Sequence, residues 1–369
     1  MPTLPALEVP IVAAPMAGGP STPELVAAVA AAGGLGFLAG GYLSGDALAA
    51  QLRDLRERSD RPFGVNLFLP PPDGGDPDPT GARSAAVAAY ARELASEAAA
   101  FDVALGDPVR DDDAVDDKIA ALAADPPAVI SLTFALPDRR RLDALRATGA
   151  ALVATVTSVD EARAAAGAGM DALCVQGAEA GGHRGVHVDR GGDPEEGAVG
   201  LLDLLDGVRA AVDLPVIAAG GLASADSVRS VLRAGAVAAQ LGTAFLRCPE
   251  AGTSATHRAA LAQRVPPPSD AAALVDEDTD RGPGTGTVVT RAFTGRPARA
   301  LGNRFVRDHG ATAPAAYPEL HHLTRPLRAA ASAAGDADAL HLWAGTAWRA
   351  ATEEPAAAVV RRCAPPGGS

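Results

Sequence analysis

Residues 175–185 read VQGAEAGGHRG, which joins the end of an apolar strand to a glycine-rich loop with one histidine. Gln176 places an amide, which both donates and accepts hydrogen bonds, at the expected carboxyl end of the strand. Gly181 and Gly182 allow the backbone to approach a ligand closely just before His183. The stretch predicts a ligand-binding loop with a candidate base, although a surface turn with an incidental histidine explains this stretch alone equally well.

Two later stretches have the same organisation, an apolar strand followed by glycine. Residues 215–221 read PVIAAGG and residues 238–246 read AAQLGTAFL. The first strand is expected to end at Gly220 and Gly221. The second is expected to end in the segment Gln240, Leu241, Gly242 and Thr243. Three such strand ends can converge on one ligand.

Short apolar segments recur along the chain and alternate with segments of helical spacing. The expected strands lie within residues 11–15, 33–42, 62–68, 128–134, 151–156, 172–176, 215–221 and 236–242. Thr22 followed by Pro23 is a typical helix start, and Ser158 and Ser224 are expected N-caps of later helices. Strands that are apolar on both faces indicate a parallel sheet covered by helices. Eight units in about 245 residues favour an α/β fold, a TIM-type (β/α)8 barrel, over an open doubly wound sheet.

The pattern changes after the eighth expected strand, so the chain is divided into three parts. Residues 1–247 are expected to form the barrel, and residues 248–325 a small additional segment inserted near the barrel mouth, with a strand-like pair in VVTRAF and RPARAL. Residues 326–369 are expected to return to the barrel through a helix from Pro326 to Ala334. The last residues, RRCAPPGGS, are expected to be a disordered tail.

The composition limits the partners. A formal net charge of −13 and a pI near 5 disfavour nucleic acid, and aromatic residues make up only 4% of the chain. The three cysteines are widely spaced, which indicates neither a zinc site nor a disulfide framework and fits a reducing, cytoplasmic location. The N-terminal stretch resembles neither a signal peptide nor a membrane span. A small-molecule protein without membrane or nucleic-acid partners is expected.

The polar residues at the strand ends predict a particular kind of ligand. Backbone N–H groups at Gly220, Gly221 and residues 240–243 could hold a phosphate without any lysine. Asn66, which is disfavoured inside a strand, and Gln176 could hydrogen-bond a planar heteroaromatic ring. Flavin mononucleotide (FMN) meets both requirements. A barrel with ordinary tight turns and no such ligand is the alternative.

Other polar residues predict no metal site or covalent chemistry. The acidic residues between 111 and 117 lack the glycine of a calcium loop, so a solvated helical surface is expected there and no metal. Lys118 is the single lysine and is not expected to form a Schiff base. His187 is expected at the surface, His257, His309 and His341 have no expected role, and His321 and His322 are candidates for the mouth of the barrel.

The motifs together resemble the nitronate monooxygenase family, FMN enzymes on a TIM-type barrel formerly called 2-nitropropane dioxygenases. The resemblance rests on VPIVAAPMAGGPSTPELVAAV, FGVNLF, QGAEAGGHRG, PVIAAGGLA and QLGTAFLRCPEAGTSATHRAAL, and more weakly on YPELHHLTRPLRAAA and LWAG. It implies flavin contacts at Met16, Asn66, Gln176, Gly181, Gly221 and Gln240 to Thr243, and a catalytic base at His183. In one class of the family a tyrosine and a lysine stand where this chain has His321 and Arg325, so the subclass stays open.

The resemblance implies oxidation of alkyl nitronates with O2 to carbonyl compounds and nitrite. A neutral imidazole with a pKa near 6.5 would be suited to remove the acidic proton of a nitroalkane, whereas with preformed nitronate His183 need only orient the anion. Two related FMN activities are alternatives, enoyl-acyl carrier protein reduction and NADH:quinone reduction. A flavin-binding barrel without turnover is the non-enzymatic alternative. The sequence leaves the physiological nitronate, the use of NAD(P)H and the oligomeric state open.

Overall fold

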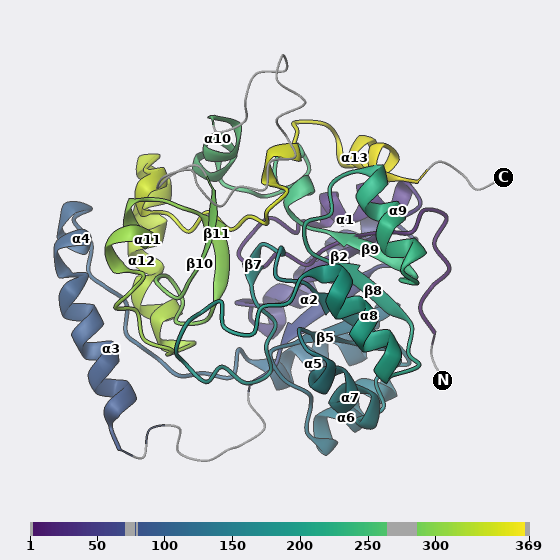
Figure 1. The fold of residues 1–369 in the computed structure, drawn as a ribbon, viewed down its shortest axis with the longest axis horizontal. Helices are drawn as coiled ribbons and strands as arrows, with labels where there is room; N and C mark the ends of the chain where they lie inside the picture. The colour runs from purple at the N-terminus through teal and green to yellow at the C-terminus, as the bar shows by residue number, and fades with distance from the viewer. Residues whose placement is uncertain (1–2, 71–77, 79, 264–285, 366–369) are drawn as a thin grey trace.

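The computed structural model describes residues 3–70, 78, 80–263 and 286–365. Eight parallel strands close into a barrel in the order β1, β2, β3, β4, β5, β6, β8, β9 (Figure 1). Their bounds are β1 Ile11–Ala13, β2 Leu35–Ala39, β3 Gly64–Phe68, β4 Val129–Thr133, β5 Ala151–Val156, β6 Ala172–Gln176, β8 Val216–Ala219 and β9 Ala238–Leu241. Each expected strand corresponds to one of these, and the predicted TIM-type barrel is confirmed.

Helices cover the outside of the barrel. They are α1 Pro23–Ala31, α2 Gly45–Arg58, α5 Val115–Ala124, α6 Arg139–Ala147, α7 Val159–Gly167, α8 Leu201–Ala211 and α9 Ala225–Arg233. The expected N-caps form, since the side chains of Thr22, Ser158 and Ser224 each accept a hydrogen bond from the third residue along. No described helix is long and apolar enough to cross a bilayer.

The barrel interior is filled by small and branched side chains together with one aromatic ring. Phe37 on β2 pairs in register with Gly64 on β3, and a Cβ atom at Gly64 would lie 2.3 Å from the Phe37 ring. Glycine at this position therefore makes room for the ring. A second apolar layer lies between strands and helices, so both faces of the strands are buried.

The C-terminal helix α13, Ala356–Cys363, completes the barrel and includes Arg361 to Cys363, the first three residues of the tail that was predicted to be disordered. Directly after β9 the chain forms the short 3₁₀ helix η1, Thr243–Phe245, and α13 packs between α9 and α1 where the eighth helix belongs (Figure 1). Val359, Val360 and Cys363 are fully buried there. The final residues, 366–369, lie outside the described part of the chain.

A second layer lies over the carboxyl ends of the barrel strands. It contains a three-stranded sheet in the order β10, β11, β7, with bounds Thr287–Thr290, Ala298–Leu301 and Gly182–His183. The strand-like pair predicted in VVTRAF and RPARAL therefore forms as β10 and β11. Around this sheet lie α3 Ala82–Glu93, α4 Ala95–Ala100, α10 Ala255–Gln263, α11 Arg304–His309 and α12 Glu319–Ala334. Helices α3 and α4 precede β4 in the chain, yet Tyr90 and Leu94 share an apolar cluster with Phe293, Phe305 and Leu327.

Helix α12 begins seven residues before the predicted start at Pro326, which lies inside it. Proline is common in the first turn of a helix, which favoured the later start, but it lacks the N–H of a helix interior. Here the N–H of Gly106 donates to the Leu323 carbonyl at 2.9 Å, so a neighbouring segment supplies a hydrogen bond next to the proline. The expected boundary between residues 325 and 326 thus falls within one continuous helix.

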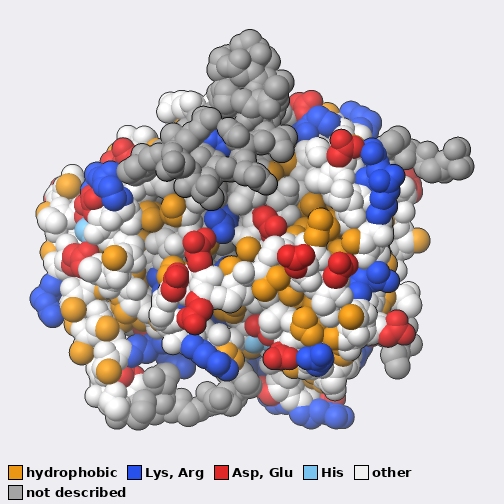
Figure 2. All heavy atoms as spheres, in the orientation of Figure 1, with side chains coloured by type: hydrophobic (Ala, Val, Ile, Leu, Met, Phe, Trp, Pro, Cys, Tyr) orange, Lys and Arg blue, Asp and Glu red, His pale blue; other side chains and the backbone are white. Residues whose placement is uncertain are grey.

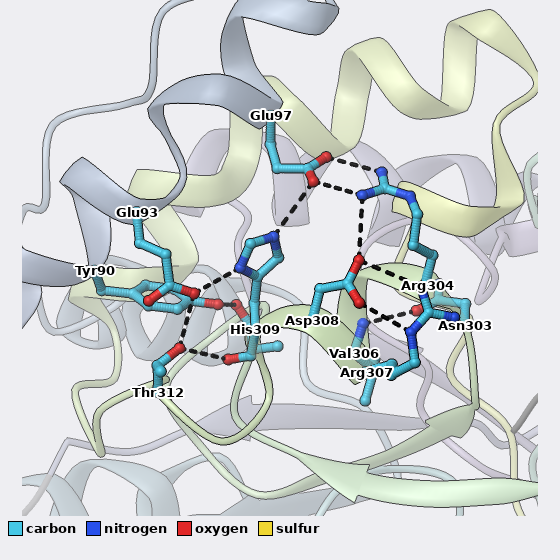
Figure 3. Close-up of polar contacts among 11 residues, drawn as sticks. Tyr90, Glu93, Glu97, Asn303, Arg304, Val306, Arg307, Asp308, His309 and Thr312 are labelled. Atoms are coloured by element: carbon cyan, nitrogen blue, oxygen red, sulfur yellow. Dashed lines mark hydrogen bonds and ion pairs between the residues drawn. The ribbon is translucent and has the colours of Figure 1, made fainter.

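A polar cluster joins α3 and α4 to α11 (Figure 3). His309 lies between two carboxylates, with Nδ1 2.6 Å from Glu93 Oε1 and Nε2 3.3 Å from Glu97 Oε1. Arg304 donates to both oxygens of Glu97, at 2.5 and 2.8 Å. His309, for which the sequence predicted no role, thus holds the outer helices of the second layer together.

The acidic segment at residues 111–117 is largely exposed, as expected, and several of its carboxylates also pair with cations. Asp116 contacts Arg140 and Arg141 at 2.6 and 2.8 Å. The Lys118 ammonium, 1% exposed, lies 2.6 Å from Asp113, and burial raises the pKa of Asp113 to about 6. Among the described residues no group of three or more His, Cys, Asp or Glu could hold a metal. On the face drawn in Figure 2, acidic and basic side chains are interspersed.

Candidate functional site

A cavity of about 670 Å³ opens where the barrel strands end, between the barrel and the second layer. It is floored by the loops after β1, β2, β3, β4, β6, β8 and β9, and α12 and the segment from Leu340 to Ala347 close it from above. Most of the residues selected from the sequence line it, namely Met16, Asn66, Gln176, Gly181, Gly182, His183, Gly220, Gly221, Gln240, Gly242 and Thr243. The convergence of separate strand ends on one cavity follows from the parallel barrel.

Leu241 is the selected residue that does not line the cavity. Its side chain is 1% exposed and packs in the layer between strands and helices. Successive strand residues point to opposite faces, so Gln240 facing the cavity directs Leu241 away from it. Its carbonyl accepts a hydrogen bond from the N–H of Ala14 at 2.8 Å, which gives Leu241 a structural role.

The turn after β8 depends on glycine at both positions. Gly220 has φ of +129° and Gly221 has φ of +66°, a region that other residues adopt at a cost. A Cβ atom at Gly221 would lie 3.0 Å from Glu179 Cβ and 3.3 Å from Thr346 Oγ1. The turn therefore brings bare backbone to the cavity wall, as close contact with a phosphate requires.

Asn66 is explained by its hydrogen bonds to the neighbouring strand. It is 2% exposed, and its Nδ2 donates to Ser131 Oγ at 2.9 Å and to Thr133 Oγ1 at 3.0 Å. These bonds leave the carbonyl oxygen of the Asn66 amide as its contribution to the cavity. The disfavoured residue type thus has a structural reason besides its expected ligand contact.

Gln176 holds the histidine loop in place. Its Nε2 donates to the His183 carbonyl at 3.1 Å, and its Oε1 accepts from the Gly185 N–H at 2.7 Å. An amide has a second N–H and a second lone pair, so one donor and one acceptor remain for a ligand. The structure adds a positioning role that the sequence did not predict.

His183 lies in β7, and the second layer positions it. It pairs with Ala298 of β11, and its Nε2 lies 2.9 Å from Thr294 Oγ1. Three aromatic rings surround the imidazole. The ring centroids of Phe134, Tyr317 and Trp343 lie 5.7, 5.9 and 5.5 Å from that of His183, and those of Phe134 and Tyr317 lie 5.4 Å apart. This aromatic wall keeps water from most of the ring.

The surroundings of His183 make it a weaker base than a free imidazole. Burial lowers its pKa from 6.5 to about 3, and the positive charges of Arg296 and Arg328 add to the effect. His183 is therefore neutral at pH 7, as the sequence predicted, but its pKa is not near 6.5. Its lone pair competes poorly for a proton, which favours a substrate that is already an anion.

Three further histidines line the cavity, two of which the sequence left without a role. Burial lowers the pKa of His257 to about 4, and it lowers the pKa values of His321 and His341 as well. These rings are neutral at pH 7 and present hydrogen-bonding nitrogens without charge. His322 lies beside the site, with Nε2 3.0 Å from Asp111. His187 is half-buried, and its ring nitrogen Nε2 lies 3.0 Å from the Thr155 carbonyl.

The charge of the cavity is opposite to that of the whole chain. No Asp or Glu is among its described lining residues, whereas Arg325 and Arg328 are. Arg296 lies just behind the wall, with its guanidinium carbon 3.9 Å above the Phe134 ring. In a chain of formal net charge −13, this arrangement favours an anionic ligand.

Sequence reasoning missed two strained residues of the wall. Tyr42 and Phe134 have φ of +68° and +81°, and both line the cavity. Tyr42 stacks on His321 with centroids 3.8 Å apart and an interplanar angle of 5°. Non-glycine residues in this region are uncommon and often occur at functional sites. Each is the last residue of an expected strand segment and lies past the end of the observed strand, and that position was the available signal.

Comparisons with known proteins agree with this geometry. The sequence profile of the family "Nitronate monooxygenase" matches residues 3–362. A nitronate monooxygenase of Pseudomonas aeruginosa is 37% identical over 96% of this chain and 95% of its own length. A probable nitronate monooxygenase of Staphylococcus saprophyticus is 34% identical over 91% of this chain and 88% of its own length. A solved structure of nitroalkane oxidase from Streptomyces ansochromogenes is 47% identical, with a TM-score of 0.84 over 97% of this chain and 95% of its own. FabK from Thermotoga maritima, 24% identical with a TM-score of 0.68 over 97% and 92%, shows the fold alone.

Proposed function

Because the chain belongs to the nitronate monooxygenase family and is an oxidoreductase, we propose that it oxidises alkyl nitronates with FMN and O2 to carbonyl compounds and nitrite. The observation that supports this most is the cavity itself. It joins glycine turns suited to a phosphate, a neutral His183 and arginine side chains in a lining without acidic residues. Both FMN and a nitronate are anions.

The residues present fit FMN. Gly220 and Gly221, with the backbone at Gly242 and Thr243, would hold the phosphate, since the positive φ values of the two glycines bring bare backbone to the cavity wall. Asn66 and Gln176 would contact the ring with their remaining acceptor and donor groups. When bound there, FMN would supply the electron transfer between substrate and oxygen, and the protein supplies position and electrostatics.

His183 would orient the substrate, because it is a weak base. With a preformed nitronate there is no proton to remove, and a neutral Nε2–H could donate to the anion after exchanging its contact with Thr294 Oγ1. With a neutral nitroalkane the same nitrogen would have to accept the carbon-bound proton, and its lowered pKa makes that step slow. Nitronates are therefore the better substrates on this account.

The aromatic residues around His183 would keep the reacting atoms dry. Phe68 and Phe134 contact each other with centroids 4.5 Å apart, and Trp343 closes the other side of the imidazole. Exclusion of water strengthens the pull of Arg328 on an anion, because charges interact more strongly in a low dielectric.

The proposal is tested by comparing substrate classes on the purified protein. The cofactor released by denaturation should run as FMN, and nitrite should form from ethylnitronate with oxygen uptake. NADPH-dependent reduction of an enoyl thioester and NADH-dependent reduction of a quinone should be slow. Rapid enoyl or quinone reduction without nitrite would favour the two alternative activities, and a colourless protein that cannot be reconstituted would exclude a flavin enzyme.

A further inference from the structure

Arg328 is a buried cation without an ion-pair partner among the described residues. It lies on α12, is 7% exposed, and lines the cavity. Its Nε donates to Thr324 Oγ1 at 3.0 Å and its Nη2 to the His321 carbonyl at 2.8 Å. A guanidinium has five N–H groups, and within the described chain no acceptor contacts those on Nη1. The side chain is thus held in place by its Nε and Nη2 groups, and the N–H groups on Nη1 remain for a ligand.

A buried charge of this kind is costly unless something balances it. Besides the Tyr42 phenol, which is neutral at pH 7, the group whose charge acts on Arg328 is Arg325, also a cation, and no carboxylate lines the cavity in the described ranges. Burial lowers the pKa of Arg328 to about 10, so it stays charged at neutral pH. Among the described residues nothing supplies this counter-charge, and an anionic ligand in the cavity would.

Arg328 also fixes the state of His321. Its Nη2 lies 3.3 Å from His321 Nδ1, and because a guanidinium only donates, Nδ1 must carry the lone pair. In the neutral ring the proton is then on Nε2, which has no protein partner in the described chain. Stacking on Tyr42 holds the ring. Arg328 Nη1 and His321 Nε2 are therefore two donors, one charged and one neutral, at the same part of the cavity wall.

This pair lies away from the glycine turns assigned to the phosphate. Tyr42, on which His321 stacks, follows β2, whereas Gly220 and Gly221 follow β8, three strands away around the barrel. The Phe68 ring instead links the pair to His183, since its centroid lies 5.5 Å from that of Tyr42 and 6.5 Å from that of His183. The two donors thus belong to the reacting end of the cavity.

Building on the proposed function, we propose that Arg328 and His321 bind the two oxygens of the substrate's anionic nitronate group, and that Arg328 thereby selects the anion over the neutral nitroalkane. Arg328 supplies the charge and His321 a neutral donor of fixed tautomer. Both are substrate-binding residues, distinct from the residues that would hold FMN.

The test measures anion binding directly, with nitrate as an inert planar probe that carries the same N–O groups. Isothermal titration of the holoenzyme gives the nitrate Kd, and steady-state assays with ethylnitronate give KM and kcat. In Arg328→Gln we expect the nitrate Kd and the ethylnitronate KM to rise by about 10- to 100-fold, as for loss of a hydrogen bond to a charged group. FMN content should be retained, and the KM for neutral nitroethane should change less than about threefold by the same argument.

Matched variants separate charge from geometry. Arg325→Gln removes an equal charge from a cavity-lining residue of the same helix that is exposed to solvent, where water screens the charge, and should raise the nitrate Kd less than Arg328→Gln. Arg328→Lys keeps the charge without the fork and should have an intermediate effect. His321→Gln, which tests the second donor if Arg328→Gln fails to fold, should raise the nitrate Kd by about three- to tenfold, as for a neutral donor to an anion.

Two results would overturn the proposal. A nitrate Kd that is the same in wild type, Arg328→Gln and His321→Gln would show that the pair binds no anion. Loss of FMN from Arg328→Gln, with a stable fold, would assign Arg328 to the cofactor phosphate. If wild type binds nitrate through Arg328 but produces no nitrite from nitronates, the proposed function fails while the anion site stands.

Discussion

Replacing His183 by Asn should change how the stability of the FMN-free protein depends on pH. The imidazole has a pKa of about 3 in the folded chain, because it is buried near Arg296 and Arg328, and about 6.5 when unfolded. Between these values the unfolded chain binds a proton that the folded chain does not. Above pH 6.5 His183 is neutral in both states and does not change the unfolding free energy. As the pH falls below 6.5, protonation of the unfolded chain lowers the unfolding free energy.

The magnitude follows from the two pKa values. Between pH 7 and pH 5 the unfolded imidazole becomes almost fully protonated while the folded one stays neutral. One pKa unit corresponds to about 1.36 kcal/mol, so His183 should contribute a loss of about 2 kcal/mol over this interval. The total change in the unfolding free energy of wild type between pH 7 and pH 5 also includes the titration of other groups. The difference between wild type and His183→Asn isolates this residue.

The assay is urea unfolding of both proteins at pH 7 and pH 5, after removal of FMN because a bound ligand adds its own free energy. The drop in unfolding free energy should be smaller by about 2 kcal/mol in His183→Asn. His257→Asn should show a similar reduction, because burial lowers the His257 pKa to about 4. Equal drops in wild type and His183→Asn would refute the reasoning, since His183 would then titrate as a solvated imidazole.

Three other substitutions have expected outcomes. His183→Asn should slow nitrite release from neutral nitroethane by about 10²-fold, the lower end of the range for a general base, but from ethylnitronate by less than about tenfold; equal losses on both substrates, with FMN retained, would mean that His183 does not act as a base. Gly221→Val should abolish FMN binding, seen in the flavin-to-protein absorbance ratio, because φ is +66° and a Cβ would lie 3.0 Å from Glu179 Cβ; a fully loaded variant would place the phosphate elsewhere. Asp113→Asn should lower the urea unfolding free energy by about 3–5 kcal/mol, because it leaves the Lys118 ammonium buried and unpaired; a loss below about 1 kcal/mol would mean that the ammonium is hydrated.

The barrel could be predicted because its signals are local and repeated. Each strand is a short run that is apolar on both faces, and caps such as Thr22 and Ser224 mark where the next helix begins. The eighth covering helix could not be placed this way, since α13 follows β9 by more than a hundred residues in the sequence. The start of α12 was predicted too late because proline usually occurs in the first turn of a helix. Here Pro326 lies inside α12, where the N–H of Gly106 donates to the Leu323 carbonyl.

The same distinction between local sequence signals and tertiary packing applies to the residues of the candidate site. Glycines and His183 stand beside expected strand ends, so the sequence could bring them together once the barrel was assumed. Arg296 and Arg328 could not be found, because they come from the second layer, and only tertiary packing brings Arg328 to the cavity and Arg296 behind its wall. Leu241 was predicted to bind the cofactor because it lies between Gln240 and Gly242, which were also selected. Side chains alternate along a strand, so Leu241 points away from the cavity when Gln240 faces it.

The central claim is that one cavity holds FMN next to a nitronate anion, and mixing without oxygen tests it most directly. Ethylnitronate added to the purified protein under nitrogen should diminish the absorbance of oxidised flavin. Admission of O2 should restore that absorbance and release nitrite. An unchanged flavin spectrum under nitrogen, or bleaching by NADH alone with no nitrite after O2 is admitted, would contradict the account.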